Sequence, residues 1–241
     1  MRIEFEVNAE RKLNLTTESN VFLPNTTTNL LISSVKSRIN SPSKILDLGC
    51  GTGVVGIALN EDKLVKQPIY ASDLSEEATN CSKVNFEQYQ CSADVRNGSM
   101  FEPWEGEIFD VIIDDISGIS QDVANVSPWF PGVPCDTGRD GTDLVSNIIK
   151  NASNHLTHNG LLFFPVLSLS NVDSIIKSAN ENFTLVERIE RKEWPLPEDL
   201  KDHIPMLRQL GIENSIKYEE RFGIVICYTE IYCASCPKLT L

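Results

Sequence analysis

The sequence predicts an α/β fold in which a doubly wound, mostly parallel sheet carries helices on both faces. Two observations support this prediction. From Lys44 onward, short apolar runs typical of buried strands alternate with segments of helical period. The first of these strands runs into a glycine-rich stretch, Asp47-Leu-Gly-Cys-Gly-Thr-Gly53, and a helix is expected directly after it, from residue 54.

The remaining elements of the predicted sheet follow in the same alternation. Further strands are expected at residues 68–72, 109–113, 161–167, 184–189 and 222–231. Further helices are expected at residues 75–88, 143–156 and 172–182. The second of these should face inward with Leu144, Ile148, Ile149 and Ala152. Outside the alternation stand a Pro- and Gly-rich stretch at 118–139 and a helix at 198–210.

The first 42 residues are expected to form a small unit packed on the main domain, which spans residues 43–241. Apolar and polar residues alternate near the N-terminus, which predicts a half-buried strand followed by a turn at 8–11 and a second strand at 12–21. A helix follows Pro24, and its apolar face is expected to consist of Leu30, Leu31, Val35 and Ile39.

The chain is acidic, which limits the partners that it can bind. It contains 21 Lys and Arg against 34 Asp and Glu, for a net charge of −13. Nucleic-acid binding draws on the neutralisation of phosphates, so a protein or a small molecule is favoured over nucleic acid as a partner. No run approaches about 18 consecutive apolar residues, so no membrane partner is expected.

Seven cysteines and an N-terminus without the features of a secretion signal favour a reducing, cytoplasmic location. Cys233 and Cys236 form a lone CxxC pair. Zinc would need two further ligands, and no His lies near the pair in the sequence. We interpret these thiols as the end of a strand, and no metal site is predicted.

The glycine-rich stretch predicts a nucleotide-like ligand. Gly49, Gly51 and Gly53 let the backbone approach a ligand closely, and the stretch also fits the GxGxxG pattern of dinucleotide-binding proteins. Asp47 separates the alternatives, because a carboxylate just before the loop would repel a pyrophosphate and attract an ammonium group. S-adenosyl-L-methionine carries such a group and no phosphate. Asp73, at the end of the next strand, could accept from both ribose hydroxyls of either cofactor.

This combination of motifs resembles the cofactor signature of class I S-adenosylmethionine-dependent methyltransferases. The resemblance implies seven strands in the order 3-2-1-4-5-7-6, with strand 7 antiparallel. It also implies that the chain binds S-adenosyl-L-methionine and releases S-adenosyl-L-homocysteine. The implied cofactor contacts are Asp47, Gly49, Cys50, Gly51, Thr52, Gly53, Asp73, Leu74, Ser99 and Met100.

Three stretches resemble the group that contains the release-factor glutamine and ribosomal-protein methyltransferases: residues 21–31, 109–117 and 138–143. The chain departs from that group where the glutamine enzymes carry Asn-Pro-Pro-Tyr, because Asp115-Ile-Ser-Gly118 stands there instead. The motif that would name the acceptor is therefore missing. The candidate substrate-binding residues are Pro24, Asn25, Thr26, Ile116, Ser117, Trp129 and Phe130.

Asp115 and Asp114 are the candidate catalytic residues. Either carboxylate could attract a cationic acceptor or take the proton that an amine must lose before it attacks. Alternatively, one of them points into the sheet edge or caps a turn. Trp129 and Phe130 could form a lid over the substrate or merely anchor a long loop.

The sequence thus predicts a methyltransferase that acts on a protein side chain or a small molecule, at nitrogen. Two alternatives stay open. One is a methyltransferase acting on nucleic-acid bases, and the other is a non-catalytic S-adenosylmethionine-binding subunit.

Overall fold

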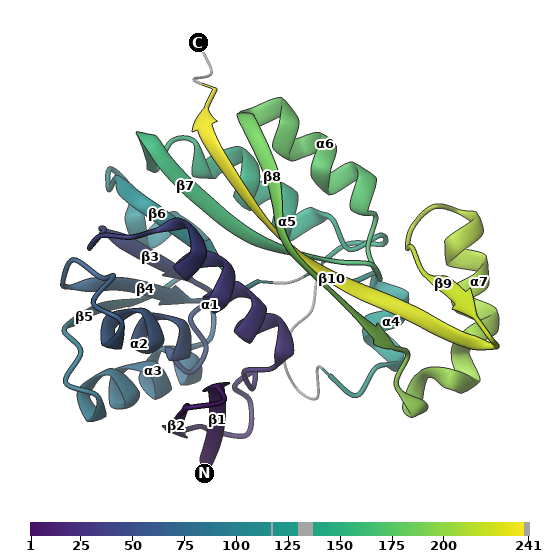
Figure 1. Ribbon diagram of the computed structural model, residues 1–241, viewed down its shortest axis with the longest axis horizontal. Helices are drawn as coiled ribbons and strands as arrows, with labels where there is room; N and C mark the ends of the chain where they lie inside the picture. Colours follow the sequence, from purple (N-terminus) through teal and green to yellow (C-terminus); the bar gives the residue numbers. More distant parts are fainter. Residues whose placement is uncertain (117, 130–136, 239–241) are drawn as a thin grey trace.

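The computed structural model describes residues 1–116, 118–129 and 137–238. Its centre is a sheet in the order β5-β4-β3-β6-β7-β10-β8, with the short β9 (Glu219–Arg221) paired to β10 (Figure 1). The parallel strands are β3 (Ile45–Leu48), β4 (Ile69–Asp73), β5 (Ala93–Asn97), β6 (Phe109–Asp114), β7 (Leu156–Leu167) and β8 (Phe183–Pro195). β10 (Ile224–Pro237) runs antiparallel to both β7 and β8. The predicted order and the antiparallel strand are confirmed.

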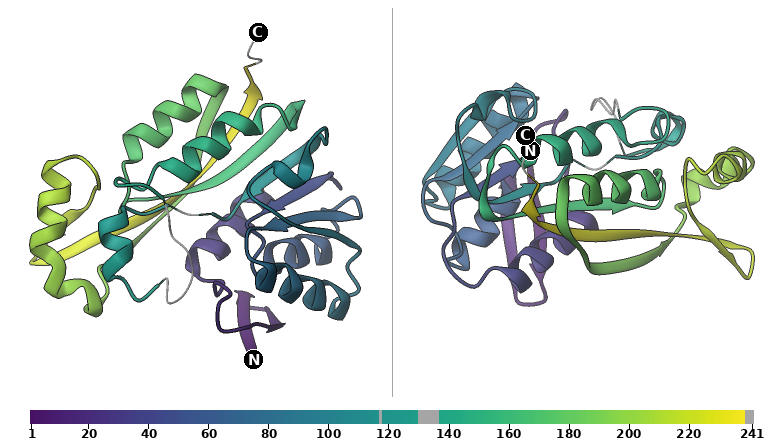
Figure 2. Two further views of the ribbon diagram at one scale, coloured as in Figure 1. Left: turned by 180° about the vertical axis from the view of Figure 1, so that it is seen from behind. Right: turned by 90° about the horizontal axis from the view of Figure 1, so that it is seen from above.

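Helices cover both faces of this sheet (Figure 2). One face carries α1 (Thr26–Arg38), α2 (Val54–Glu61) and α3 (Glu76–Gln88), whose apolar residues share one core. The other face carries α5 (Asp143–Ala152) and α6 (Val172–Asn182). A third apolar cluster joins the end of β8 and the start of β10 to α4 (Gln121–Val126) and α7 (Ile204–Ile212). A 3-10 helix, Glu198–His203, precedes α7 and contributes Leu200 to the same cluster.

Several predicted boundaries move. The helix expected to reach residue 156 ends at Ala152, because the Phe109 N–H donates to the His155 carbonyl at 2.8 Å and Leu156 already belongs to β7. Leu144 was expected on the buried face of α5, but it is only half-buried, and Val145 is buried in its place. The helix expected at 198–210 is split into a 3-10 turn and α7.

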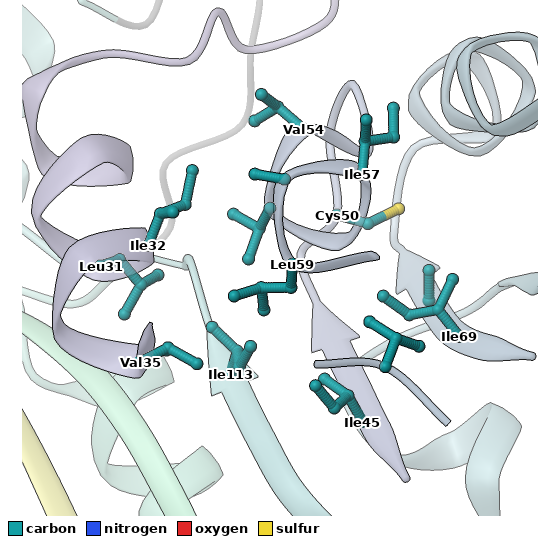
Figure 3. Packing of buried hydrophobic residues seen from close by; sticks show 14 of the residues in the cluster. Leu31, Ile32, Val35, Ile45, Cys50, Val54, Ile57, Leu59, Ile69 and Ile113 are labelled. Carbon is teal, nitrogen blue, oxygen red and sulfur yellow. The ribbon is translucent and has the colours of Figure 1, made fainter. Parts of the chain in front are cut away.

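Apolar side chains of α1 fix that helix to the sheet. Leu31, Ile32 and Val35 lie toward Leu59 of α2 and Ile113 of β6 (Figure 3). All of these side chains are buried. Burial of a side chain of this size contributes about 1.5–3 kcal/mol, so α1 belongs to the same core as the strands.

The N-terminal hairpin, β1 (Arg2–Asn8) and β2 (Arg11–Thr16), is tied to the glycine loop through one buried amide. The Asn85 side chain of α3 accepts from the Thr16 N–H at 2.7 Å. It also donates to the carbonyls of Thr16 and Thr52, both at 2.9 Å. Asn85 is fully buried, so no water replaces these bonds at low cost.

We expect Asn85→Ala to lower the free energy of unfolding by about 2–4 kcal/mol, because it removes the partners of backbone groups in half-buried Thr16 and buried Thr52. Urea unfolding at neutral pH measures this change. Gln88→Ala is the matched control, since Gln88 also donates to the hairpin, at the Asn14 carbonyl, but from an exposed position. Equal costs for the two variants would contradict the proposed anchoring by Asn85.

Candidate active site

A cavity of about 500 Å³ opens at the carboxyl ends of β3, β4 and β6. Its walls come from the segment before α1, the glycine loop, the start of α3, the turn after β5 and the end of β6. Ligands bind at this edge in open α/β sheets, because the loops that leave neighbouring strands diverge there. The described lining includes four carboxylates, those of Asp73, Glu76, Glu77 and Asp115, and no Lys or Arg.

The glycine loop needs glycine for both conformation and space. Gly49, Gly51 and Gly53 all have positive φ angles, between 49° and 76°. A Cβ atom on Gly49 would lie 2.4 Å from Cγ1 of Ile116, which follows β6. Of the predicted contacts here, Gly49, Cys50, Gly51 and Thr52 line the cavity, and Gly53 is the N-cap of α2.

Asp73 connects the glycine loop to α3. One carboxylate oxygen accepts from the Gly51 N–H and the other from the Ser75 N–H, both at 2.9 Å. Burial raises the pKa of Asp73, and these backbone donors oppose the rise. Asp73 also lines the cavity, and an ionised carboxylate can accept more hydrogen bonds than these. Leu74 beside it is 66% exposed, an unusual position for a leucine.

Ser99 and Met100 also line the cavity, as predicted contacts in the turn after β5. This turn is tied to β4, because the Gly98 N–H donates to the Asp73 carbonyl at 3.1 Å. The Asn97 side chain donates to the carbonyls of Asp73 and Leu74 at 3.1 and 3.0 Å. These hydrogen bonds therefore fix the turn after β5 against the end of β4.

Asp47 lies behind the glycine loop and does not line the cavity. It is fully buried, and its Oδ2 accepts from the Gly56 N–H of α2 at 3.2 Å. Its Oδ1 has no hydrogen-bond partner among the described residues. Burial raises the pKa of Asp47 to about 7, against the effect of the Gly56 N–H. Asp47 was expected to contact the cofactor directly, and the structure places it behind the loop instead.

Asp114 and Asp115 point to opposite faces of the sheet. Asp115 lines the cavity, and its Oδ2 accepts from the Thr28 hydroxyl of α1 at 3.2 Å. Asp114 is fully buried away from the cavity, and its Oδ1 accepts from the Ile116 N–H at 2.9 Å. Burial raises the pKa of Asp115 to about 8, and the charge of Asp47 adds to the rise. Burial also raises the pKa of Asp114 well above its usual range.

The other predicted substrate contacts divide into three groups. Pro24 and Ile116 line the cavity. Asn25 is the N-cap of α1 and Thr26 its exposed first residue, and neither lines the cavity. Trp129 packs edge-on against Trp194, with ring centroids 5.8 Å apart, which agrees with the loop anchor and not with a lid. Ser117 and Phe130 lie outside the described residues.

Thirteen of the described lining residues were not predicted as contacts: Asn20, Phe22, Thr28, Leu48, Val54, Ser72, Ser75, Glu76, Glu77, Ala78, Gly98, Thr137 and Leu144. Thr28 left a signal in the sequence, because a side chain three residues after an N-cap is placed to complete a capping box. Leu144 was expected in the core.

Comparison with known proteins bears out the resemblance. Residues 12–115, somewhat less than half of the chain, match the family model of the methyltransferase small domain. The predicted resemblance to S-adenosylmethionine-dependent methyltransferases is thereby confirmed.

The curated relatives named here come from bacteria. A release factor glutamine methyltransferase of Gloeobacter violaceus is 31% identical over 133 residues, which are 52% of this chain and 46% of the relative. A ribosomal protein L11 methyltransferase of Lactobacillus johnsonii is 25% identical over 70% of this chain and 46% of the relative. The chain thus spans about half the length of the curated relatives it matches.

Solved structures share the fold of the methyltransferase domain. A 16S rRNA N2 G1207 methyltransferase of T. thermophilus, in complex with AdoMet and guanosine, superposes with a TM-score of 0.62 at 13% identity. That match covers 98% of this chain and 50% of the other. A ribosomal protein L11 methylase of Lactobacillus delbrueckii gives a TM-score of 0.51 at 14% identity, over 86% of this chain and 79% of the other.

Within the described residues, every helix is too short or too polar to cross a membrane.

The raised pKa values of Asp47, Asp114 and Asp115 predict that the ligand-free protein loses stability as pH rises. A folded-state pKa above the unfolded value means that the folded protein holds extra protons. The stabilisation is complete below about pH 4 and is lost as pH rises through the folded values near 7 to 8 for Asp47 and Asp115. Each group lowers the free energy of unfolding by up to about 1.4 kcal/mol for every pH unit of this range.

We expect Asp114→Asn to reduce this loss, since the amide keeps an oxygen for the Ile116 N–H and never ionises. Urea unfolding at about pH 6 and about pH 9 measures the difference. Asp110→Asn, at an exposed position of the same strand, is the control. A pH dependence that is the same in Asp114→Asn and in the wild type would refute the interpretation.

Proposed function

We propose that this protein transfers a methyl group from S-adenosyl-L-methionine to a nitrogen atom of a protein side chain or a small molecule. The proposal rests above all on the charge of the cavity, in which four carboxylates and no Lys or Arg lie among the described lining residues. S-adenosylmethionine carries a sulfonium and an ammonium, so this cavity attracts it. A dinucleotide would bring a pyrophosphate to the same carboxylates.

The proposed cofactor fits the residues that surround the cavity. The carboxylate of Asp73 lines the cavity and can accept from the two ribose hydroxyls. Leu74 offers exposed apolar surface to the adenine, and Met100 of the turn after β5 lines the same cavity. The Thr52 hydroxyl is buried without a hydrogen-bond partner in the described residues, at the N-terminal end of α2, where a carboxylate is favoured.

Asp115 is our candidate for the group that handles the acceptor. The bound cofactor supplies a methyl group on a positively charged sulfur, and the protein aligns a nucleophile with it. An amine must be neutral to attack. Asp115 can hold the cationic amine and take its proton, because a pKa near 8 lies close to the working pH of a general base. In this proposal Asp114 is structural, with its carboxylate fixing the turn at Ile116.

The acidic chain supports a protein or small-molecule acceptor over RNA. A net charge of −13 and an acidic cavity oppose the close approach of phosphates. The curated relatives named above carry release factor and ribosomal protein in their names, which agrees with a protein acceptor. A cytoplasmic location, which the cysteine content predicts, belongs to the same proposal.

Calorimetric titration tests the cofactor. We expect S-adenosylmethionine and S-adenosylhomocysteine to bind and NAD not to bind. Asp73→Asn should weaken both by about 10- to 100-fold, because one acceptor oxygen for the ribose and the loop is lost. Asp94→Asn on the neighbouring strand β5 lies outside the cavity and should bind normally. Binding of NAD alone would overturn the proposal.

Transfer of labelled methyl groups tests the acceptor. The protein is incubated with labelled S-adenosylmethionine and with separate protein, RNA and small-molecule fractions of a cell extract. We expect label in the protein or small-molecule fraction, and Asp115→Asn should reduce it by about 100-fold or more while the cofactor still binds. Label in RNA would favour the nucleic-acid alternative, and cofactor binding without transfer to any fraction would favour a non-catalytic subunit.

A further inference from the structure

Thr28 is the polar contact that the described structure gives the Asp115 carboxylate from outside β6. Its hydroxyl lies 3.2 Å from Asp115 Oδ2, and Thr28 is 2% exposed. The two residues are 87 positions apart in the sequence, so the contact joins the first turn of α1 to the end of β6. Both residues line the cavity.

The direction of the Thr28 hydroxyl is fixed by the cap of α1. Thr28 Oγ1 accepts from the Asn25 N–H at 3.3 Å, and the Asn25 side chain accepts from the Thr27 N–H at 2.7 Å. This capping box occupies the acceptor side of the hydroxyl. The single hydroxyl proton is therefore left for Asp115, and the positive end of the α1 dipole lies beside the same carboxylate.

The other groups near Asp115 disfavour its charge. Asp47 of β3 raises its pKa, as does burial at the base of the cavity. Asp114, its neighbour on β6, lies on the opposite face, and the two carboxylates repel each other. No Lys or Arg lines the described part of the cavity. Thr28 thus opposes the loss of water and the charge of Asp47, both of which raise the pKa of Asp115.

We propose that Thr28 is a positioning residue, which holds the Asp115 carboxylate toward the cavity and favours its ionised form. The inference rests on the proposed function, in which Asp115 receives the proton of the acceptor. It adds that the N-terminal segment, through Thr28, favours the ionised form of Asp115. It also adds that the bound cofactor favours the same form, because a positively charged sulfonium near Asp115 stabilises the carboxylate as Thr28 does.

Carbon-13 NMR of protein labelled at the aspartate carboxyl groups tests the contact without any ligand. The Asp115 signal is identified by its absence in Asp115→Asn. We expect its titration midpoint, about 8 in the wild type, to rise by about one unit in Thr28→Val. Thr28→Ser restores the hydroxyl and should return the midpoint to within about 0.3 units of the wild type.

Thr27→Val is the matched control, because it makes the same change one residue earlier on α1, where the structure gives the hydroxyl no hydrogen bond to Asp115. An equal midpoint in Thr28→Val and the wild type would overturn the inference. So would an equal shift in Thr27→Val or a failure of Thr28→Ser to restore the midpoint, since a general loosening of α1 would then explain the effect.

Proton release on cofactor binding separates this inference from the proposed function. Calorimetry in two buffers of different ionisation enthalpy, near pH 7.5, counts the protons released. S-adenosylmethionine should release more protons than S-adenosylhomocysteine, and this difference should vanish in Asp115→Asn. When the measurement is repeated across neutral and alkaline pH, the range over which the difference occurs should lie higher in Thr28→Val than in the wild type. Lack of cofactor binding would refute the proposed function and leave the NMR result to decide on Thr28. Binding with the same pH dependence of proton release in Thr28→Val and the wild type would refute the role of Thr28.

Discussion

The glycine loop is held in place by carboxylates, and the rest of the cavity depends on this constraint. Asp73 binds the Gly51 and Ser75 N–H groups from the side, and Asp47 binds the Gly56 N–H from behind. These bonds fix the loop against the first turns of α2 and α3. A loop of glycines has high conformational freedom in the unfolded chain, so such bonds must offset a large entropic cost.

Two buried carboxyl groups near the glycine loop are difficult to ionise in the ligand-free protein. Asp47 and Asp114 are fully buried, and each has one oxygen without a hydrogen-bond partner within the described residues. Burial raises the pKa of both groups, so each carboxyl resists ionisation in the ligand-free protein. A buried polar oxygen without a hydrogen-bond partner costs stability, and such costs are common near functional sites.

The sequence predicted most of the strands and the glycine loop because both depend on local signals. The glycine motif and the apolar strands are readable along the chain, whereas the family resemblance supplied the order of the strands in the sheet. β5 was not singled out, because Ala93–Asn97 contains Asp94 and Arg96 and is only partly buried throughout. Leu144 was assigned to the core because the apolar period of α5 allows a shift of one residue.

The acceptor side of the cavity was harder to predict, because tertiary contacts form it. The sequence left open which of Asp114 and Asp115 faces the cavity, and the packing of α1 places Asp115 there. Thr28 and Asn20 come from the N-terminal segment, far from β6 in the sequence. Likewise, Asp47 looked like a ligand contact until the fold placed it behind the loop.

The position of β10 has a consequence for synthesis on the ribosome. β10 lies between β7 and β8 and pairs with both, although it leaves the ribosome after them. Until then β7 and β8 each present an unpaired edge, and unpaired edges are sites of aggregation. The half of the sheet from β3 to β6 can pair earlier, because its strands are complete by residue 114. The nascent chain therefore passes through a stage in which β3 to β6 are paired, whereas β7 and β8 still lack β10 between them.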